Sequence, residues 1–261
     1  MNELTISQRK RLTSLSTAKG RKANGLFMVE GLRAISEMST SLPGHMREII
    51  ATSEWWNEHP DFSSQNNITQ YSAKRIDIER ISSLSSPQPV IATFAIPEIS
   101  IPNINNLSTQ LSVALDSVQD PGNLGTIIRL CDWWGVRHPF CSGDTADCFS
   151  PKVVQASMGA LGRVNVYRTD LSTLITSFTA CNIPVCGTFM QGEDILHSPL
   201  PSSGALIIFG NEGNGISSHI EASVTRRLTI PSYAQNNHVE SLNVATACAI
   251  CLAMFRRNSI K

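Results

Sequence analysis

The second half of the sequence alternates between short apolar runs and longer amphipathic stretches, and this alternation limits the folds open to it. Runs that favour β-strands lie at residues 111–118, 136–141, 163–168, 184–188, 205–209 and 228–230. Stretches that favour helices lie at residues 124–134, 150–161, 171–180, 217–226 and 241–255. Strands that alternate with helices form parallel sheets, because each crossover helix packs back onto a face of the sheet. The sequence therefore predicts an α/β fold with a parallel sheet covered on both faces.

Two of these strands lead into loops that are suited to hold a ligand. The run 205–209 continues into Gly210-Asn-Glu-Gly-Asn-Gly215, and the run 228–230 ends at Pro231 before a polar loop. Glycines leave the backbone open to close approach, and parallel sheets bind ligands beyond the carboxyl ends of their strands. The glycine order matches neither a dinucleotide fingerprint nor a phosphate loop. By itself, this loop is as consistent with a tight turn as with a binding site.

The helix expected at 124–134 presents Arg129 away from its apolar side. Its apolar stripe consists of Ile127, Leu130, Cys131 and Trp134, and this spacing places the four on one face. Asn123 is expected to be the N-cap. Arg129 points roughly opposite to the stripe, so it is solvated unless a substrate or a second subunit covers it. The last helix is apolar almost all round, which indicates a core helix or a subunit interface.

Residues 1–96 are expected to form a smaller α/β unit, joined by a linker at 97–110 that is rich in Pro, Asn and Ser. The 21 Lys and Arg balance 21 Asp and Glu, so no global charge attracts nucleic acid. A local basic cluster is dense, however, and consists of Arg9, Lys10, Arg11, Lys19, Arg21, Lys22 and Arg33. The stretches 7–15 and 16–22, which carry most of this cluster, are expected to be helical with a break near Gly20. The cluster is either a solvated face or a surface that binds RNA or DNA.

Cysteine and histidine usage indicates neither disulfides nor a metal site. The seven cysteines are scattered, and the first residues contain no secretory apolar segment. Reduced thiols and a cytoplasmic location are expected. Cys248 and Cys251 have the spacing of a redox pair, but they lie in an apolar stretch where buried structural thiols are favoured. The six histidines show no metal-ligand spacing with the cysteines. No apolar run is long enough to span a membrane.

Three motifs taken together resemble those of the SpoU/TrmH-type RNA ribose 2'-O-methyltransferases of the SPOUT superfamily. They are Asn123-x-Gly125-x-x-x-Arg129, the segment from Phe209 to Ile216, and Ile230-Pro231 followed by Glu240-Ser-Leu-Asn-Val244. The resemblance covers residues 111–256, and the segment 27–33 with Arg21 resembles an L30e-like RNA-binding domain. It implies a C-terminal α/β trefoil-knot domain at 111–261, preceded by an L30e-like domain at 1–96. It also implies a homodimer.

The resemblance further implies the cofactor S-adenosylmethionine and a set of site residues. The cofactor would lie against Thr188, Gly210, Asn211, Gly215, Ile230 and Leu242. The catalytic positions would be Arg129, Asn123, Glu212, Ser241 and Asn243. RNA would contact Arg9, Lys10, Arg11, Arg21, Lys22, Arg33 and Lys152. Arg129 would act on the ribose hydroxyl, but a guanidinium rarely gives up its proton, so orienting the hydroxyl or holding a phosphate are open alternatives.

The expected function is methylation of a ribose 2'-hydroxyl in structured ribosomal or transfer RNA. One alternative is a catalytically inactive RNA-binding module of the same fold, although the motif residues are intact. Another is a nucleotide-dependent oxidoreductase, which the glycine order disfavours. The loop 231–240 is longer than the family pattern leads us to expect, and Ser232 replaces a common hydrophobic residue.

Overall fold

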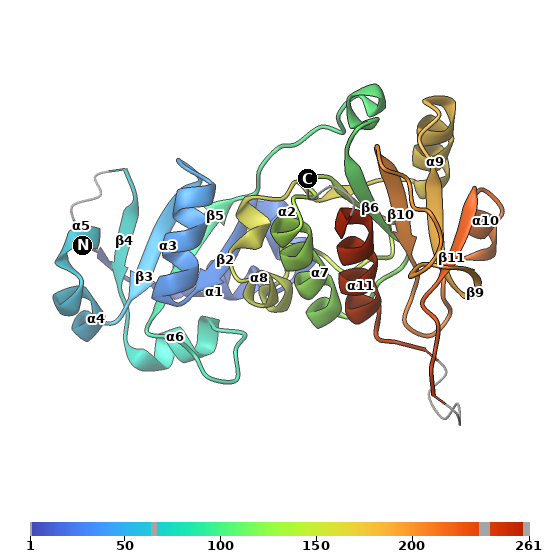
Figure 1. Cartoon of the computed structure of the whole chain (residues 1–261). Helices are drawn as coiled ribbons and strands as arrows, with labels where there is room; N and C mark the ends of the chain where they lie inside the picture. The colour runs from blue at the N-terminus through green and yellow to red at the C-terminus, as the bar shows by residue number, and fades with distance from the viewer. Residues whose placement is uncertain (1, 64–66, 235–240, 258–261) are drawn as a thin grey trace. The chain divides into compact units, whose positions relative to one another are not determined.

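The computed structural model describes residues 2–63, 67–234 and 241–257, which form two compact units (Figure 1). The first unit comprises residues 1–98 together with 147–163, and the second comprises 99–146 and 164–261. The sequence-based division at 96 and 111 did not anticipate that residues 147–163 belong with the first unit. The reason is apolar packing: the ring of Phe149 lies 4.9 Å from that of Phe27, and Val153 and Val154 are buried.

The first unit is built on a mixed sheet. Its strands are β1 (Asn2–Glu3), β2 (Leu26–Glu30), β3 (Met46–Ala51), β4 (Thr69–Ser72) and β5 (Val90–Ala95). Its helices are α1 (Ile6–Ser14), α2 (Ala18–Asn24), α3 (Leu32–Ser41), α4 (Ser53–Glu58), α5 (Pro60–Ser63), α6 (Arg75–Ile81) and α8 (Pro151–Ser157), with a 3-10 turn η2 (Ala160–Gly162). Within the described residues the strand order is β1-β4-β3-β5-β2. Strand β5 pairs antiparallel with β2 and β3, whereas β4 pairs parallel with β1 and β3.

The basic N-terminal stretch does form two helices, but the break between them is not at Gly20. It lies between Ser14 and Ala18, where the side chain of Thr17 accepts a hydrogen bond from the Gly20 amide and caps α2. Gly20 lies inside α2 because the helix packs closely there: a Cβ at this position would lie 2.0 Å from the Ser14 carbonyl oxygen. The glycine therefore serves helix packing and does not mark a turn.

Residues 147–163 are held in the first unit by a buried cation and by two glycines. The side chain of Arg21 is 4% exposed, and it pairs with Asp147 while donating to the carbonyl oxygens of Leu15 and Ser16. A Cβ at Gly159 would lie 2.5 Å from the Glu37 carboxylate, and one at Gly162 would lie 2.6 Å from Cβ of Ser41. Both glycines thus let the segment contact α3 closely.

The second unit contains the predicted parallel sheet. Its strands are β6 (Leu111–Leu115), β7 (Pro139–Cys141), β8 (Tyr167–Arg168), β9 (Val185–Asp194), β10 (Ala205–Phe209) and β11 (Arg226–Thr229). Its helices are α7 (Pro121–Trp133), α9 (Leu171–Ala180), α10 (Ser218–Glu221) and α11 (Val244–Arg257), with a 3-10 turn η1 (Ile104–Leu107). Over the described ranges the order is β11-β9-β10-β6-β7-β8, and every pairing is parallel.

Both faces of this sheet are covered, as the sequence predicts. Leu206 and Ile208 of β10 pack in a core cluster with Phe178 of α9. The alternate residues Ile207 and Phe209 point to the opposite face and are also fully buried. Helices α7 and α11 lie side by side (Figure 1). Strand order does not report how the chain threads, so the knot stays a prediction.

Several predicted boundaries of the second unit were wrong. Strand β9 extends to Asp194, well beyond the predicted end at residue 188. Helix α10 is much shorter than the predicted 217–226: it ends at Glu221, and Arg226 already belongs to β11. Most of the predicted loop 231–240 lies outside the described residues, so the expectation about its length is not addressed. No helix in the described part of the chain combines the length and apolar character needed to cross a membrane.

Arg21 should therefore contribute to stability. Arg21→Ala would leave the Asp147 carboxylate and two carbonyl oxygens without their donor, and we expect the unfolding free energy to fall by roughly 2–3 kcal/mol. The neighbouring exposed Lys22 provides a matched control, since Lys22→Ala should change stability by less than about 0.5 kcal/mol. Urea unfolding measures both, and equal effects of the two substitutions would contradict the structural role of Arg21.

Candidate active site

The carboxyl ends of four adjacent strands of the second unit form the candidate site. Strands β11, β9, β10 and β6 are neighbours in the parallel sheet, so their carboxyl ends lie at one edge. Gly210 follows the end of β10 and Ile230 the end of β11, whereas Thr188 lies inside β9, directly after Gly187, which is in register with Ile208 of β10 and Arg227 of β11. The Thr188 hydroxyl donates to the Ile208 carbonyl oxygen at 3.1 Å, joining β9 to β10. The three predicted cofactor contacts therefore lie on neighbouring strands, near the carboxyl ends of β10 and β11.

The glycine loop after β10 is closed by its own hydrogen bonds. The backbones of Asn211 and Gly215 exchange two N–H···O bonds of 2.9 Å each. The Asn211 side-chain oxygen accepts from the amides of Gly213 and Asn214 at 2.9 and 3.0 Å, and its Nδ2 donates to the Ser117 carbonyl oxygen at 2.8 Å. Asn211 is therefore the internal support of the loop.

Gly210 is required for a different reason from the one expected. The sequence suggests that glycines clear space for a ligand. In the structure, a Cβ at Gly210 would lie 2.1 Å from the Gly215 carbonyl carbon and 2.2 Å from the Ile216 nitrogen. The first glycine thus allows the loop to close on itself. Gly215 has φ +69°, and its missing Cβ would meet nothing within 4 Å, so its requirement is conformational.

A buried carboxylate that the sequence analysis missed fixes the far end of this loop. Asp116, only 4% exposed, follows β6 directly. Its Oδ2 accepts hydrogen bonds from both the amide and the hydroxyl of Ser217, each at 2.7 Å. The next residue, Ser117, has φ +58° and supplies the carbonyl oxygen to which Asn211 donates. An acidic residue directly after a buried strand was the available sequence signal.

Three of the five predicted catalytic side chains are joined in one network. Asn123 Nδ2 donates to Glu212 Oε1 at 2.8 Å, and Asn243 Nδ2 donates to Asn123 Oδ1 at 2.8 Å. Asn243 Oδ1 in turn accepts from the amides of Ala245 and Thr246 at the start of α11. The three motifs therefore meet through a single amide side chain.

The expectation that Asn123 is the N-cap of its helix was wrong. Helix α7 begins at Pro121, and Asp120 caps it by accepting from the Asn123 amide at 2.7 Å. Because Asp120 takes the capping role, the side chain of Asn123 is available for the other two motifs.

Arg129 and Ser241 stand apart from this network. Arg129 is exposed on α7, about 120° around the helix axis from Asn123. Neither the side chain of Arg129 nor that of Ser241 makes a hydrogen bond or ion pair with any residue that the structure describes. Trp133, one turn further along α7, is 81% exposed, and Leu242 beside Ser241 is 50% exposed. The surface that carries Arg129 therefore combines a cation with exposed apolar area.

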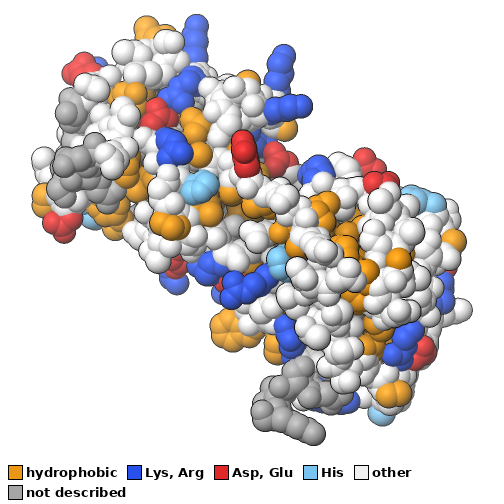
Figure 2. Space-filling view, turned by 90° about the horizontal axis from the view of Figure 1, so that it is seen from above, with side chains coloured by type: hydrophobic (Ala, Val, Ile, Leu, Met, Phe, Trp, Pro, Cys, Tyr) orange, Lys and Arg blue, Asp and Glu red, His pale blue; other side chains and the backbone are white. Residues whose placement is uncertain are grey.

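The predicted RNA-contacting cations of the first unit have three kinds of surroundings. Arg9 pairs with Asp77, Arg11 with Glu48, and Arg33 with Glu37. Arg21 is buried and fully engaged, so it is unavailable to a phosphate and is withdrawn from the RNA-binding set. Of the predicted RNA contacts, Lys10, Lys22 and Lys152 are exposed and have no partner among the described residues, and the same holds for Lys19 of the basic cluster. On the face shown in Figure 2, Lys and Arg side chains are interspersed with uncharged ones and form no continuous patch.

The cysteine pair of the last helix is buried. Cys248 and Cys251 are 0% and 1% exposed, and burial raises the pKa of the Cys251 thiol to about 12. The pKa of Cys248 is likewise raised by burial. Protonated thiols are poor nucleophiles and poor metal ligands. Across the described residues, no group of three or more His, Cys, Asp and Glu side chains is arranged to hold a metal ion.

Comparison with known proteins finds two families along the chain. Residues 110–253 match the SpoU rRNA Methylase family, and residues 7–92 match the MRM3-like substrate binding domain. The 23S rRNA (guanosine(2553)-2'-O)-methyltransferase RlmP of Bacillus subtilis is 32% identical over 244 residues, covering 93% of each chain.

Solved structures agree over nearly the full length. A Porphyromonas gingivalis structure described as belonging to the TrmH family superposes with a TM-score of 0.85 at 39% identity, covering 97% of this chain and 98% of that one. The AdoMet-bound rRNA methyltransferase from Sinorhizobium meliloti superposes with a TM-score of 0.83 at 26% identity, covering 100% of this chain and 98% of that one.

The geometry of the glycine loop predicts that two of its glycines differ sharply in how well they tolerate substitution by alanine. Gly210→Ala should open the loop, because its Cβ would collide with backbone, and should weaken binding of S-adenosylmethionine by roughly tenfold or more, in line with an overpacking cost of about 1–3 kcal/mol. At Gly213 a Cβ would meet only Asn211 Oδ1 at 3.6 Å, so Gly213→Ala should be tolerated. Calorimetric titration and thermal unfolding test both, and equal affinity and stability of the two variants would show that loop closure is not the constraint.

Proposed function

This chain belongs to the SpoU rRNA Methylase family, and we propose that it transfers a methyl group from S-adenosylmethionine to a ribose 2'-hydroxyl of structured RNA. The observation that carries the proposal is the network in which Asn123 joins Glu212 and Asn243 beside the glycine loop. The intact network, and relatives named as methyltransferases, favour an active enzyme over an inactive binding module of the same fold. Family membership also removes the oxidoreductase alternative.

The strand-end loops fit S-adenosylmethionine. The loop 210–215 exposes its main chain at Gly213 and Gly215, where no side chain covers it, while Ile230 and Leu242 offer partly exposed apolar surface for an adenine ring. We therefore place the cofactor against Thr188, Gly210, Asn211, Gly215, Ile230 and Leu242. When bound, S-adenosylmethionine supplies the electrophilic methyl group. The protein's own contribution is to hold the two reactants in line.

Arg129 is the residue we assign to the RNA ribose. The N–H groups of its guanidinium have no partner among the described residues. It can therefore donate to the 2'-oxygen and orient it, or bind the adjacent phosphate in a forked geometry. Asn123, Glu212, Ser241 and Asn243 complete the proposed site, with Asn123 fixing the loops relative to one another.

Ribosomal RNA is the proposed substrate. The Bacillus subtilis relative, which matches over 93% of each chain, is named for 23S rRNA, and this favours ribosomal over transfer RNA. Lys10, Lys22 and Lys152 are exposed cations suited to phosphate contacts. Arg9 and Arg11 are held by carboxylate partners, whereas Arg33 bonds Glu37 through Nε alone and keeps its terminal N–H groups available. An enzyme with this substrate would work in the cytoplasm.

Methyl transfer to RNA is the direct test. Wild-type protein should transfer tritium from labelled S-adenosylmethionine to total unmodified ribosomal RNA. Arg129→Ala should reduce that transfer by roughly a hundredfold or more, the loss typical of a group that stabilises the transition state. Its cofactor affinity and thermal stability should stay unchanged, because Arg129 is exposed and unpaired within the described structure. An inactive wild type would refute the proposed function, and an active Arg129→Ala enzyme would refute the role of Arg129.

We further propose that the enzyme is a homodimer in which Arg129 serves the partner's cofactor. Arg129 and Trp133 are both exposed on α7, and Ala249, Ile250, Ala253 and Met254 of α11 are apolar yet only half-buried. A two-fold interface through these helices would cover both surfaces. It would also bring Arg129 to the cofactor site of the partner.

Subunit mixing tests this shared site. Leu242→Asp would place a carboxylate in the cofactor surface at an exposed position, and should abolish activity without unfolding the chain. Mixtures of Arg129→Ala and Leu242→Asp subunits should regain part of the wild-type activity, because hybrid dimers contain one intact site. Light scattering should give twice the 28.5 kDa chain mass. A fully active monomer, or a dimer without complementation, would contradict the shared site.

A further inference from the structure

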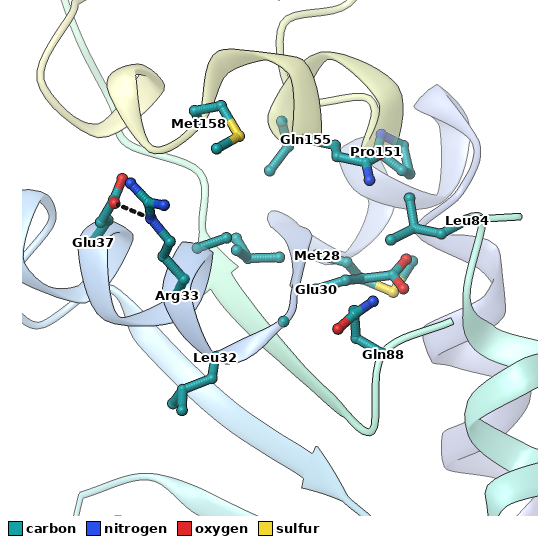
Figure 3. Close-up of a pocket in the computed structure, with 14 residues that line it drawn as sticks. Met28, Glu30, Leu32, Arg33, Glu37, Leu84, Gln88, Pro151, Gln155 and Met158 are labelled. Carbon is teal, nitrogen blue, oxygen red and sulfur yellow. Dashed lines mark hydrogen bonds and ion pairs between the residues drawn. The ribbon is translucent and has the colours of Figure 1, made fainter. Parts of the chain in front are cut away.

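The first unit contains a cavity of about 370 Å³ that the methyl-transfer site does not use (Figure 3). Three stretches line it: residues 28–34 with Glu37, then Leu84 with Gln88, and four residues between 151 and 158 of the segment that returns to this unit from the middle of the sequence. The first two lie within the part that matches a substrate-binding domain, and the third lies within the SpoU match. The cavity therefore exists only because residues 147–163 pack against the first unit.

The inner surface of the cavity is largely apolar. Met28 and Val29 of β2 are 2% and 1% exposed, and Val154 and Met158 of α8 and its C-cap form the opposite wall. Figure 3 shows α8 with Pro151, Gln155 and Met158 on one side, and Glu30 with Gln88 on the other. A volume near the lower end of the usual 300–1,000 Å³ for ligand pockets suits one small planar group between two apolar walls.

Polar groups around the cavity are positioned to form hydrogen bonds with the edge of a planar ligand. The Glu30 carboxylate is held in position because it accepts from the Ser82 hydroxyl at 2.5 Å and from the Ser83 amide at 3.2 Å. Gln88 donates from Nε2 to the Ser86 carbonyl oxygen, which leaves its Oε1 available. The side-chain amide of Gln155 has no hydrogen-bond partner among the described residues. Together they offer fixed acceptors and a free donor, the complement of a nucleobase edge.

The mouth of the cavity carries a planar cation. The Arg33 side chain is 81% exposed, and its Nε donates to Glu37 Oε1 at 3.1 Å, one helical turn away. This contact holds the guanidinium while its terminal N–H groups stay available. A guanidinium in this setting can bind a phosphate or stack on a base. A purely apolar ligand would use none of Glu30, Gln88, Gln155 and Arg33.

We propose that this cavity binds one unpaired nucleobase of the RNA substrate and so contributes to the choice of RNA. The inference rests on the proposed function, since it requires an RNA substrate. The base lies between Met28 and the Val154–Met158 wall, its polar edge meets Glu30, Gln88 and Gln155, and Arg33 contacts the backbone outside. Bases in double-stranded RNA are not accessible to such a pocket, so recognition requires a loop, a bulge or an end.

The test compares a variant that fills the cavity with a matched variant that does not. Ala34 lines the cavity, and Ala34→Phe would occupy it. Ser36 lies on the same helix, is exposed and does not line the cavity, so Ser36→Phe adds the same ring elsewhere. Gln155→Leu removes an exposed polar group without filling the cavity. It provides a second test variant in case Ala34→Phe does not fold. Thermal unfolding of the full chain establishes that each variant is folded.

The probes are single-stranded RNA hexanucleotides of mixed sequence, the same hexanucleotides with abasic positions, and free nucleoside monophosphates. Ala34→Phe and Gln155→Leu should bind the normal hexanucleotides roughly tenfold to a hundredfold more weakly than wild type, the effect of losing one bound base. Ser36→Phe should bind like wild type. Wild type should bind the abasic hexanucleotides about as weakly as Ala34→Phe binds the normal ones.

Three outcomes would overturn the proposal. They are equal binding of normal and abasic hexanucleotides by wild type, unchanged RNA binding by folded Ala34→Phe and Gln155→Leu, and free nucleotides binding as tightly as the hexanucleotides. Cofactor binding and tritium transfer by wild type are measured in parallel. Loss of wild-type transfer refutes the proposed function, whereas an active wild type with any of these three binding results refutes the pocket alone.

Discussion

The side chain of Asn123 is the point at which the parts of the candidate active site depend on one another. It donates to Glu212 in the glycine loop and accepts from Asn243 at the start of α11. Each of these partners has a separate structural task, because Glu212 lies within the closed loop and Asn243 caps the last helix. A change at Asn123 would therefore affect both loops at once. Asp120 makes this arrangement possible, because it caps α7 and leaves the side chain of Asn123 free for these two contacts.

The loops around the proposed cofactor site are built before any ligand arrives. Asn211 braces the glycine loop from within, and Asp116 holds its far end through Ser217. Ordering a loop costs conformational entropy, and here internal hydrogen bonds offset that cost during folding rather than during binding. Preorganisation of this kind suits a reaction in which the protein mainly aligns two reactants. Arg129 is the exception, since nothing in the described part of its own chain holds it.

The two units are not two consecutive pieces of sequence. Residues 147–163 leave the second unit, supply α8 to the first, and complete its cavity. The buried Arg21 that anchors this segment through Asp147 belongs to the basic cluster whose composition indicates an RNA-binding surface. One arginine of that cluster thus has a structural role, while the nearby Lys22 is exposed. Local charge density alone does not distinguish the two, because it contains no information about what lies opposite each side chain.

The sequence by itself determined the parallel α/β sheet, the ends of β10 and α9, and the motifs that carry the site, because apolar periodicity and motif spacing are local properties of the chain. Only the tertiary structure decided which residues of these segments contact one another. The partners of Asn123 lie 89 and 120 positions away, and that of Arg21 lies 126 positions away. The need for glycine at position 210 likewise depends on how its loop closes. Such contacts arise when the sheet brings distant segments together, and no local pattern in the sequence specifies them.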